Sequence, residues 1–448
     1  MKKLALVLSI LLLNACGGGG GGSASNSDVS VATTPIALGL TDTFAFSAVY
    51  GGGGVWNGSS SISASGEADG GGGAGDGEFI QVKANFPYSG NPTGTLYWKD
   101  LRSQYGIGGT YGTLNIQVDS TNGGYKVISA SLNGGAFNPP SANQQNIFVS
   151  TNGIISGTVP LPIGSGQDTP FTASRFADTP VGGISALAGQ YVYGSLYATA
   201  GTGANPSVGH GILYINPTGA TATSAVGRAC TYPATTYSPT CPGFDVNIAY
   251  NNPPATNVVQ ITLAPTQSIA TNQVGFSLLA VFKSYGSSGL SFSGDFATTT
   301  NGNTGIIYGS RIPAVAITPA SFVGTYATSI ISNFNAGNIS GLTHNYGAAD
   351  VQSVTGSIRL ADINQANSFN CTTAQANESV ITAGPNNGSL TLAPVVSTGS
   401  YPTYVIQIDV DTYIGVNADS VAANENFSLI RTTATPPVGA SGGICAPI

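Results

Sequence analysis

The sequence predicts an all-β protein of tandem antiparallel β-barrel or β-sandwich domains. After residue 35, short segments that alternate apolar and polar residues recur, with glycine, asparagine, serine or proline between them. A period of two residues is that of a half-buried strand, and helical periodicity is nearly absent. Charged residues make up only 7% of the chain, which also holds 63 glycines and 20 tyrosines. This composition is typical of exported β-rich proteins.

The candidate strands group into three β domains, at residues 36–165, 184–312 and 321–448. About eight strands fall in each domain, a number that suits a small closed barrel. Because most gaps between strands are short, we expect meander barrels of the lipocalin type in the second and third domains. A jelly roll or an immunoglobulin-like sandwich is the alternative.

The second and third domains align as a degenerate repeat. The matching segments are 188–191 with 323–326, 211–214 with 356–359, and 261–265 with 390–394. Cys230 and Cys371 also follow the first tyrosine of their domains at similar distances. The alternative is a chance similarity between strands that are rich in glycine and threonine.

The N-terminus has the pattern of an export signal. Lys2 and Lys3 precede an apolar run at residues 4–13, which is too short for a membrane-spanning helix of about 20 residues. Asn14 and Ala15 follow this run, and then come Cys16 and six glycines. We therefore expect a signal peptide at residues 1–15. The alternative is an ordinary secretion signal in which Cys16 has no role.

Residues 13–16 resemble the lipobox of bacterial lipoproteins, although Asn14 replaces the small or β-branched residue usual there. The resemblance implies that Cys16 receives a diacylglyceryl group, that the preceding peptide is removed, and that the new N-terminus is acylated with palmitate or a similar chain. Several acyl chains make a firm anchor. The implied partner of Cys16 is therefore the outer membrane.

A flexible tether follows the lipidation site at residues 16–35, because a glycine run behaves as a random coil. A cysteine followed by glycines resembles the start of Gram-negative surface lipoproteins, in this N-terminal segment only. Gly17 stands where the inner-membrane retention signal of bacterial lipoproteins has an aspartate. The resemblance implies an outer-membrane protein at the cell surface, with the periplasmic face as the alternative.

The four remaining cysteines predict two disulfides, since an even number in an exported chain is typical of disulfide bonding. Cys230 and Cys241 lie close in sequence with two prolines between them, which favours a local loop closure. Cys371 and Cys445 would then join the C-terminal tail to its domain. A redox or metal role would require C-x-x-C spacing or nearby histidines.

The charge balance makes nucleic acid an unlikely partner. Twelve basic residues and a net charge of −7 cannot readily build a phosphate-binding stripe. The sequence also carries no signature of a cofactor, so none is expected.

Catalytic residues were sought among the histidines and carboxylates. His210 and His344 are isolated, and neither lies near a G-x-S-x-G nucleophile elbow. Asp409 and Asp411 lie within the segment 404–416, where residues two apart share a strand face. Two such carboxylates are weak candidates for a Ca²⁺ site or for the acid and base of a glycosidase, which needs them about 5–9.5 Å apart. The other interpretation is an outward, solvated face, so no metal is expected.

Aromatic residues supply the remaining binding candidates. Trp98, Tyr105 and Tyr111 are the densest group, and such side chains stack on sugars or form protein interfaces. Trp98 alternates with Leu96, which favours a place in the core over a binding role.

These features predict a lipid-anchored outer-membrane lipoprotein with a non-catalytic binding role: adhesion, ligand capture or envelope interaction. The expected partner is an extracellular protein or glycan. Two alternatives remain. One is an envelope polysaccharide hydrolase that uses Asp409 and Asp411. The other is a lipocalin-like carrier with an apolar cavity for a small ligand.

Overall fold

The all-β prediction is confirmed, and every strand pairing is antiparallel. No helix among the described residues is long and apolar enough to cross a membrane. A computed structural model describes residues 53–62, 76–87, 92–100, 111–118, 125–132, 135–137, 146–149, 154–159, 169–175, 183–199, 207–231, 234–250, 258–265, 276–285, 288–298, 303–332, 343–354, 357–364, 379–394, 403–410, 412–417 and 427–432.

The first unit is a nine-stranded sheet in the order β4-β3-β2-β1-β9-β8-β7-β5-β6. An additional pairing joins β4 to β5, and β5 also pairs with β7, so the pairing runs round a closed circuit. Its strands are β1 (Gly53–Ile62), β2 (Asp76–Asn85), β3 (Thr93–Asp100), β4 (Tyr111–Val118), β5 (Tyr125–Leu132), β6 (Gly135–Phe137), β7 (Asn146–Val149), β8 (Ile154–Val159) and β9 (Thr169–Arg175).

Two closed eight-stranded meander barrels follow, so the barrel expectation holds over the sandwich. The first barrel is formed by β10 (Gly189–Thr199), β11 (Ser207–Ile215), β12 (Ser224–Thr231), β13 (Gly243–Tyr250), β14 (Val258–Pro265), β15 (Phe276–Tyr285), β16 (Gly289–Thr298) and β17 (Asn303–Arg311). The second is formed by β18 (Gly324–Ser332), β19 (Thr343–Val354), β20 (Ser357–Asn364), β21 (Ser379–Ala383), β22 (Ser389–Pro394), β23 (Thr403–Asp409), β24 (Thr412–Asn417) and β25 (Phe427–Thr432).

Apolar side chains at alternate positions of the strands fill the interior of the first barrel, as the sequence pattern predicts. In β13, Phe244, Val246 and Ile248 are buried in the barrel core, whereas Asp245 and Asn247 between them are exposed. Successive residues of a strand point to opposite faces, so every second residue enters the interior. An eight-stranded barrel is just wide enough for such side chains to fill it.

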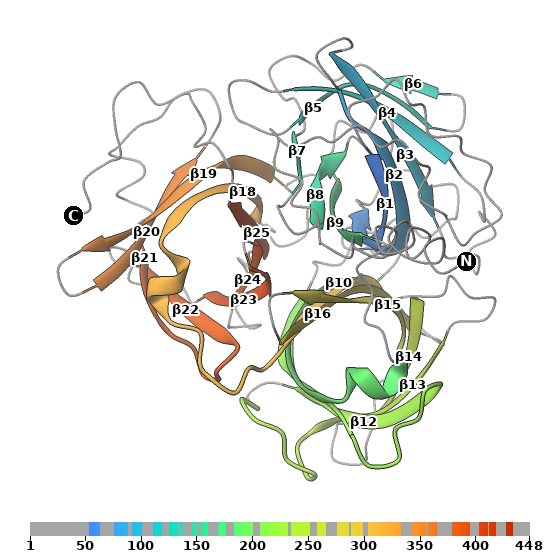
Figure 1. Ribbon diagram of the computed structural model, residues 1–448, viewed down its shortest axis with the longest axis vertical. Helices are drawn as coiled ribbons and strands as arrows, with labels where there is room; N and C mark the ends of the chain where they lie inside the picture. Colours follow the sequence, from blue (N-terminus) through green and yellow to red (C-terminus); the bar gives the residue numbers. More distant parts are fainter. Residues whose placement is uncertain are drawn as a thin grey trace, which may run out of the picture.

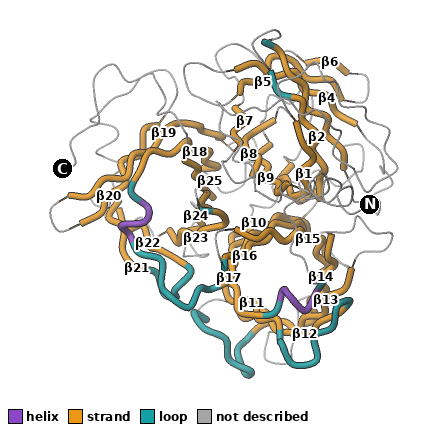
Figure 2. The backbone as a smooth tube through the Cα atoms, viewed as in Figure 1, coloured by secondary structure: helices purple, strands orange, loops and turns teal. Residues whose placement is uncertain are grey.

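A short 3-10 turn precedes the first strand of each barrel, shown in purple in Figure 2. In the first barrel, η3 (Ile184–Leu187) buries Ile184 and Leu187 in the core. The Tyr191 hydroxyl donates to the Leu187 carbonyl at 2.5 Å, and Arg311 Nη2 donates to the Ala186 carbonyl at 2.6 Å. These contacts fasten the turn to the barrel.

The second barrel repeats this arrangement, with η4 (Pro319–Phe322) burying Phe322 before β18. The segments 261–265 and 390–394 also lie in the fifth strand of their barrels, as the repeat predicts. The alignment of 211–214 with 356–359 was wrong, because 211–214 lies in the second strand of its barrel, whereas the described part of 356–359 begins the third strand, β20. Strands share one period, so a glycine-based alignment can slip by a whole strand.

The three units pack around the wall formed by β16 and β17 of the first barrel. Strands β1 and β2 lie against this wall on one side, and β23 of the second barrel also lies against it. Figure 1 shows the three units meeting beside β10 and β16. Because β9 completes the first sheet beyond residue 165, we propose that the first domain extends to residue 175 and that η3 and η4 begin the other two.

Gly183, directly before η3, provides a test of how the 3-10 turn is held against the first barrel. Its φ is +73°, and an added Cβ would lie 2.5 Å from the Ala222 carbonyl oxygen, which accepts the Ile184 N–H bond at 3.0 Å. We expect Gly183→Ala to lower the free energy of unfolding by about 2–3 kcal/mol, through the left-handed backbone and the clash together.

Gly219→Ala is the matched control, since Gly219 has φ +82° and open space around its Cβ position. Gly219→Ala should lower the free energy of unfolding by only about 1 kcal/mol, the cost of a left-handed backbone for a residue with a Cβ. If denaturant unfolding shows equal losses of unfolding free energy for both variants, the close contact of Gly183 with the Ala222 carbonyl does not limit the side chain at this position.

Candidate functional site: the junction between the two barrels

The hairpin formed by β23 and β24 is apolar on both faces. Val405 and Tyr413 pack into the core of the second barrel. The opposite face packs on the outer wall of the first barrel, through Ile406, Ile408 and Ile414 against Val192, Ile212 and Tyr308. The hairpin therefore serves two cores at once and joins the two barrels.

A buried ion pair lies in this junction. Lys283, on β15 of the first barrel, places its Nζ 2.6 Å from Asp409 Oδ2, at the end of β23. The side chains are 2% and 0% exposed. Asp409 Oδ1 accepts a hydrogen bond from the Val410 N–H at 2.7 Å. Removing either partner would leave a buried charge uncompensated.

Tyr285 ties the same two strands together. Its hydroxyl donates to the Gln407 carbonyl at 3.2 Å and lies 2.6 Å from Ser310 Oγ. A phenol has one proton, so Ser310 is the donor in the second bond. Burial raises the pKa of Tyr285 to about 12, the Ser310 hydrogen bond acts against this rise, and the charge of Asp409 adds to it. The hydroxyl is therefore a neutral donor at physiological pH.

The structure does not support a pair of carboxylates on one strand face. β23 ends at Asp409, Val410 is exposed in the turn, and β24 begins at Thr412, which pairs with Asp409. Asp411 lies outside the described residues. The expected solvated face is also wrong for Asp409, because its carboxylate is fully buried against Lys283.

The connection between the barrels, residues 312–318, runs as a loop from β17 to η4 (Figure 2) and is hydrogen-bonded to both barrels. The Ile312 N–H donates to the Gln190 carbonyl at 2.7 Å in the first barrel. In the second, Asn387 Nδ2 donates to the Pro313 and Ala314 carbonyls at 3.3 and 3.2 Å. The connection thus limits how far the two barrels can separate.

The Cys230–Cys241 disulfide that the sequence predicts is present, and the loop that it closes flanks the junction. We call the described part of this loop, residues 230–231 and 234–242, the stapled loop. The two cysteines are 5.5 Å apart at Cα and pack in the same cluster as Ile406 and Ile414 of the second barrel. The disulfide therefore shapes one side of the contact between the barrels.

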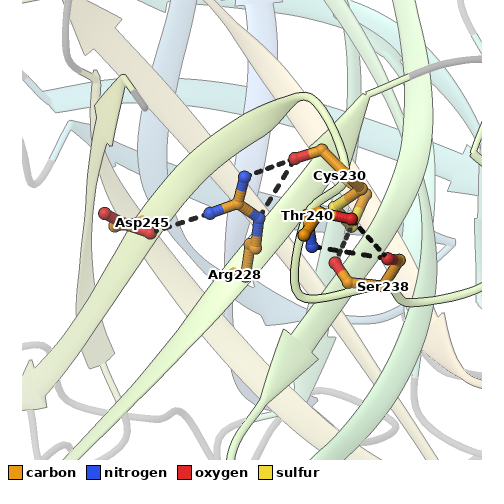
Figure 3. A network of polar contacts seen from close by, with 6 residues as sticks. Arg228, Cys230, Ser238, Thr240 and Asp245 are labelled. Atoms are coloured by element: carbon orange, nitrogen blue, oxygen red, sulfur yellow. Dashed lines mark hydrogen bonds and ion pairs between the residues drawn. A yellow bond between two sulfur atoms is a disulfide. The ribbon is translucent and has the colours of Figure 1, made fainter. Parts of the chain in front are cut away.

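Arg228 holds the end of the stapled loop against the barrel wall (Figure 3). Its Nε donates to the Cys241 carbonyl at 3.1 Å, and its Nη1 lies 3.2 Å from Asp245 Oδ1. Ser238 and Thr240 join their hydroxyls at 3.2 Å within the loop (Figure 3). The loop is thus ordered by covalent, ionic and hydrogen-bonding contacts together.

Aromatic pairs border the junction on the outer face of β11. The rings of Tyr214 and Tyr237 stack at 4.0 Å, which folds the stapled loop back onto the barrel. The His210 ring meets that of Tyr404 from the second barrel edge-on at 4.9 Å. His210, weighed as a catalytic base, therefore lies in an aromatic contact between the barrels.

The other residues predicted from the sequence are only partly placed. Trp98 on β3 pairs with Gly112, one position from Tyr111 on the neighbouring strand β4. These two aromatic residues thus come from adjacent strands. The residues that lie outside the described parts of the chain are Cys16, Tyr105, Cys371 and Cys445.

Lys283, Tyr285 and Ser310 were missed by sequence reasoning. Lys283 ends an apolar run in β15 and is one of only twelve basic residues in the chain. A lone lysine directly after such a run was a signal of a buried partner. In the described ranges, no three His, Cys, Asp or Glu side chains lie close enough to hold a metal ion.

Comparisons with known proteins find only weak similarity. No family model and no curated protein matches the sequence. Among solved structures, a double mutant of the vaccine antigen transferrin-binding protein B (TbpB) from Haemophilus parasuis is 11% identical, with 84% of this chain and 75% of that chain covered and a TM-score of 0.20.

A single mutant of the same antigen is 8% identical, with 85% and 76% covered and a TM-score of 0.18. An intact TbpB with N and C lobes is 9% identical, with 84% and 75% covered and a TM-score of 0.17. TM-scores of this size carry no argument about function.

The stapled loop predicts a measurable disulfide contribution. Replacing Cys230 and Cys241 by alanine together should lower the free energy of unfolding by about 3 kcal/mol, as expected for closing a loop of this length. Amide exchange in residues 234–242 should also rise. A change below about 0.5 kcal/mol in denaturant unfolding would contradict this role.

The Tyr285 bonds predict both a stability loss and a pH effect. Tyr285→Phe should cost about 1–2 kcal/mol at pH 7, because the Gln407 carbonyl loses its donor. The pKa of Tyr285 is raised from 10.0 to about 12, so its stabilising effect is complete below pH 10 and is lost as pH rises towards 12.

Between pH 7 and pH 11, the free energy of unfolding should therefore fall less in Tyr285→Phe than in the parent. Tyr237→Phe is the control, since the Tyr237 ring packs by stacking in a partly exposed loop. Identical pH profiles for Tyr285→Phe and the parent would contradict the assignment.

Proposed function

We propose that this chain is a lipid-anchored outer-membrane lipoprotein with a non-catalytic binding role, and that the stapled loop is its binding surface. The observation that carries the proposal is the order of this loop, which a disulfide and Arg228 hold in place. A loop that is rigid before binding loses less conformational entropy on association. Binding residues are commonly found on loops supported by a rigid scaffold.

The chemistry of the loop favours an uncharged, hydrogen-bonding partner. Thr235, Thr236 and Thr240 are exposed, and Ser238 and Tyr237 are partly exposed. Tyrosine combines apolar contact with a polar hydroxyl, and serine provides adaptable hydrogen bonds, as in antibody binding sites. An extracellular protein or a glycan has matching chemistry.

The anchor follows from the first residues of the chain. Cys16 stands directly after an apolar signal segment and before six glycines, which fits lipidation and a flexible tether. A tethered domain can reach partners away from the membrane surface. This supports adhesion or capture at the cell surface.

The two alternative functions have less support. Asp409, the candidate acid of a polysaccharide hydrolase, is committed to Lys283 and is fully buried. The carrier alternative requires a cavity, but the interior of the first barrel is packed with aromatic rings. Tyr191, Phe282 and Phe292 lie within 5.3–5.9 Å of one another by ring centroids.

A binding screen of the parent chain and of two single-residue variants tests the proposal. The mature chain without its tether is assayed against arrays of glycans, extracellular proteins and envelope components. We expect Thr240→Glu, in the stapled loop, to weaken binding at least about tenfold, since it adds a charge to an uncharged contact. Thr262→Glu is the control, an equally exposed threonine on β14.

Absence of binding to all three classes would overturn the role. Equal loss in both variants would place the binding surface elsewhere.

The anchor has its own prediction. Cys16→Ala should move the protein from the membrane fraction to the soluble fraction and abolish incorporation of labelled palmitate. Protease treatment of intact cells expressing the parent should release the protein if it is at the surface. Retention of Cys16→Ala in the membrane fraction would contradict lipid anchoring.

A further inference from the structure

We propose that the Lys283–Asp409 ion pair is an orientation key: it selects one rotational arrangement of the two barrels and contributes little to their net stability. The pair joins residues 126 positions apart, on two barrels that each close by themselves. Neither barrel needs the pair to complete its own hydrogen bonding. Its effect is therefore on how the barrels meet.

The apolar part of the junction does not define a rotation. Ile406, Ile408 and Ile414 pack on aliphatic and aromatic groups of the first barrel, and hydrophobic contact is non-directional. Related arrangements that slide or turn the hairpin on this wall would bury a similar apolar area. The connecting segment limits separation of the barrels through its bonds at Gln190 and Asn387.

The ion pair separates these arrangements in energy. At 2.6 Å and almost without exposure, it is satisfied only when Lys283 on β15 and Asp409 at the end of β23 lie side by side. Any other rotation leaves a charged group buried without its partner, at a cost of several kcal/mol. Replacing such a pair by apolar residues is often neutral for stability, so its value lies in excluding alternatives.

A hydrogen bond beside the ion pair also depends on the orientation of the two barrels. The Tyr285 hydroxyl donates across the junction to the Gln407 carbonyl, two residues from Asp409. The irregular register between Gln407 and Asp409 turns the aspartate towards the first barrel. Two directional contacts at one point of the hairpin fix a rotation that the isoleucines leave open.

Distance measurements between the barrels test this proposal in the full mature chain. Spin labels are attached through ketone-bearing residues at exposed Asn247 and Thr382, one on each barrel, which leaves the cysteines untouched. The parent should give one narrow distance distribution. Lys283→Met with Asp409→Leu should leave the midpoint of denaturant unfolding nearly unchanged and give a broadened or double distance distribution.

Asp245→Asn is the control, since it removes the exposed charge of an ion pair that lies within one barrel and leaves the Arg228 bond to the Cys241 carbonyl in place. It should leave the distribution unchanged. A single narrow distribution in the Lys283→Met, Asp409→Leu variant, with the parent's mean distance, would overturn the proposal.

If the apolar variant does not fold, Lys283→Gln with Asp409→Asn removes the charges and keeps both side chains polar. A broadened distribution in that variant supports the ion pair as the key. A distribution equal to that of the parent overturns it. The readout is independent of any ligand, so it is separate from the binding role proposed above.

Discussion

The docking of the β23–β24 hairpin onto the outer wall of the first barrel is the contact on which the rest of the arrangement depends. One face of the hairpin completes the second barrel, and the other packs against the first barrel around the Lys283–Asp409 pair. The stapled loop and the connection between the barrels border the same contact. The first unit packs on the same wall, beside β16 and β17.

The scarcity of charge gives this ion pair its importance. With 7% charged residues, the chain uses apolar and hydroxyl groups for most contacts, and these discriminate poorly between similar arrangements. A buried pair costs desolvation energy but penalises every mismatch. Under the binding role proposed for this chain, such selection would be an advantage, since a fixed arrangement lowers the entropy lost on binding.

Local features of the fold were predictable from the sequence, whereas the junction was not. The strand period gave the all-β class, and the spacing of Cys230 and Cys241 gave the disulfide, because both depend on neighbouring residues. Asp409 was misread because the turn after it breaks the strand pattern that Asp411 would have continued. Its partner Lys283 lies 126 residues away, and no local pattern predicts a pairing at that distance.

Calorimetry of the mature chain tests most directly the claim that the hairpin makes the two barrels one unit. If the β23–β24 hairpin serves both cores, unfolding one barrel exposes an apolar face of the other. The barrels should therefore unfold in a single cooperative transition, with equal calorimetric and van't Hoff enthalpies for the pair. Two separate transitions, one for each barrel, would contradict the account.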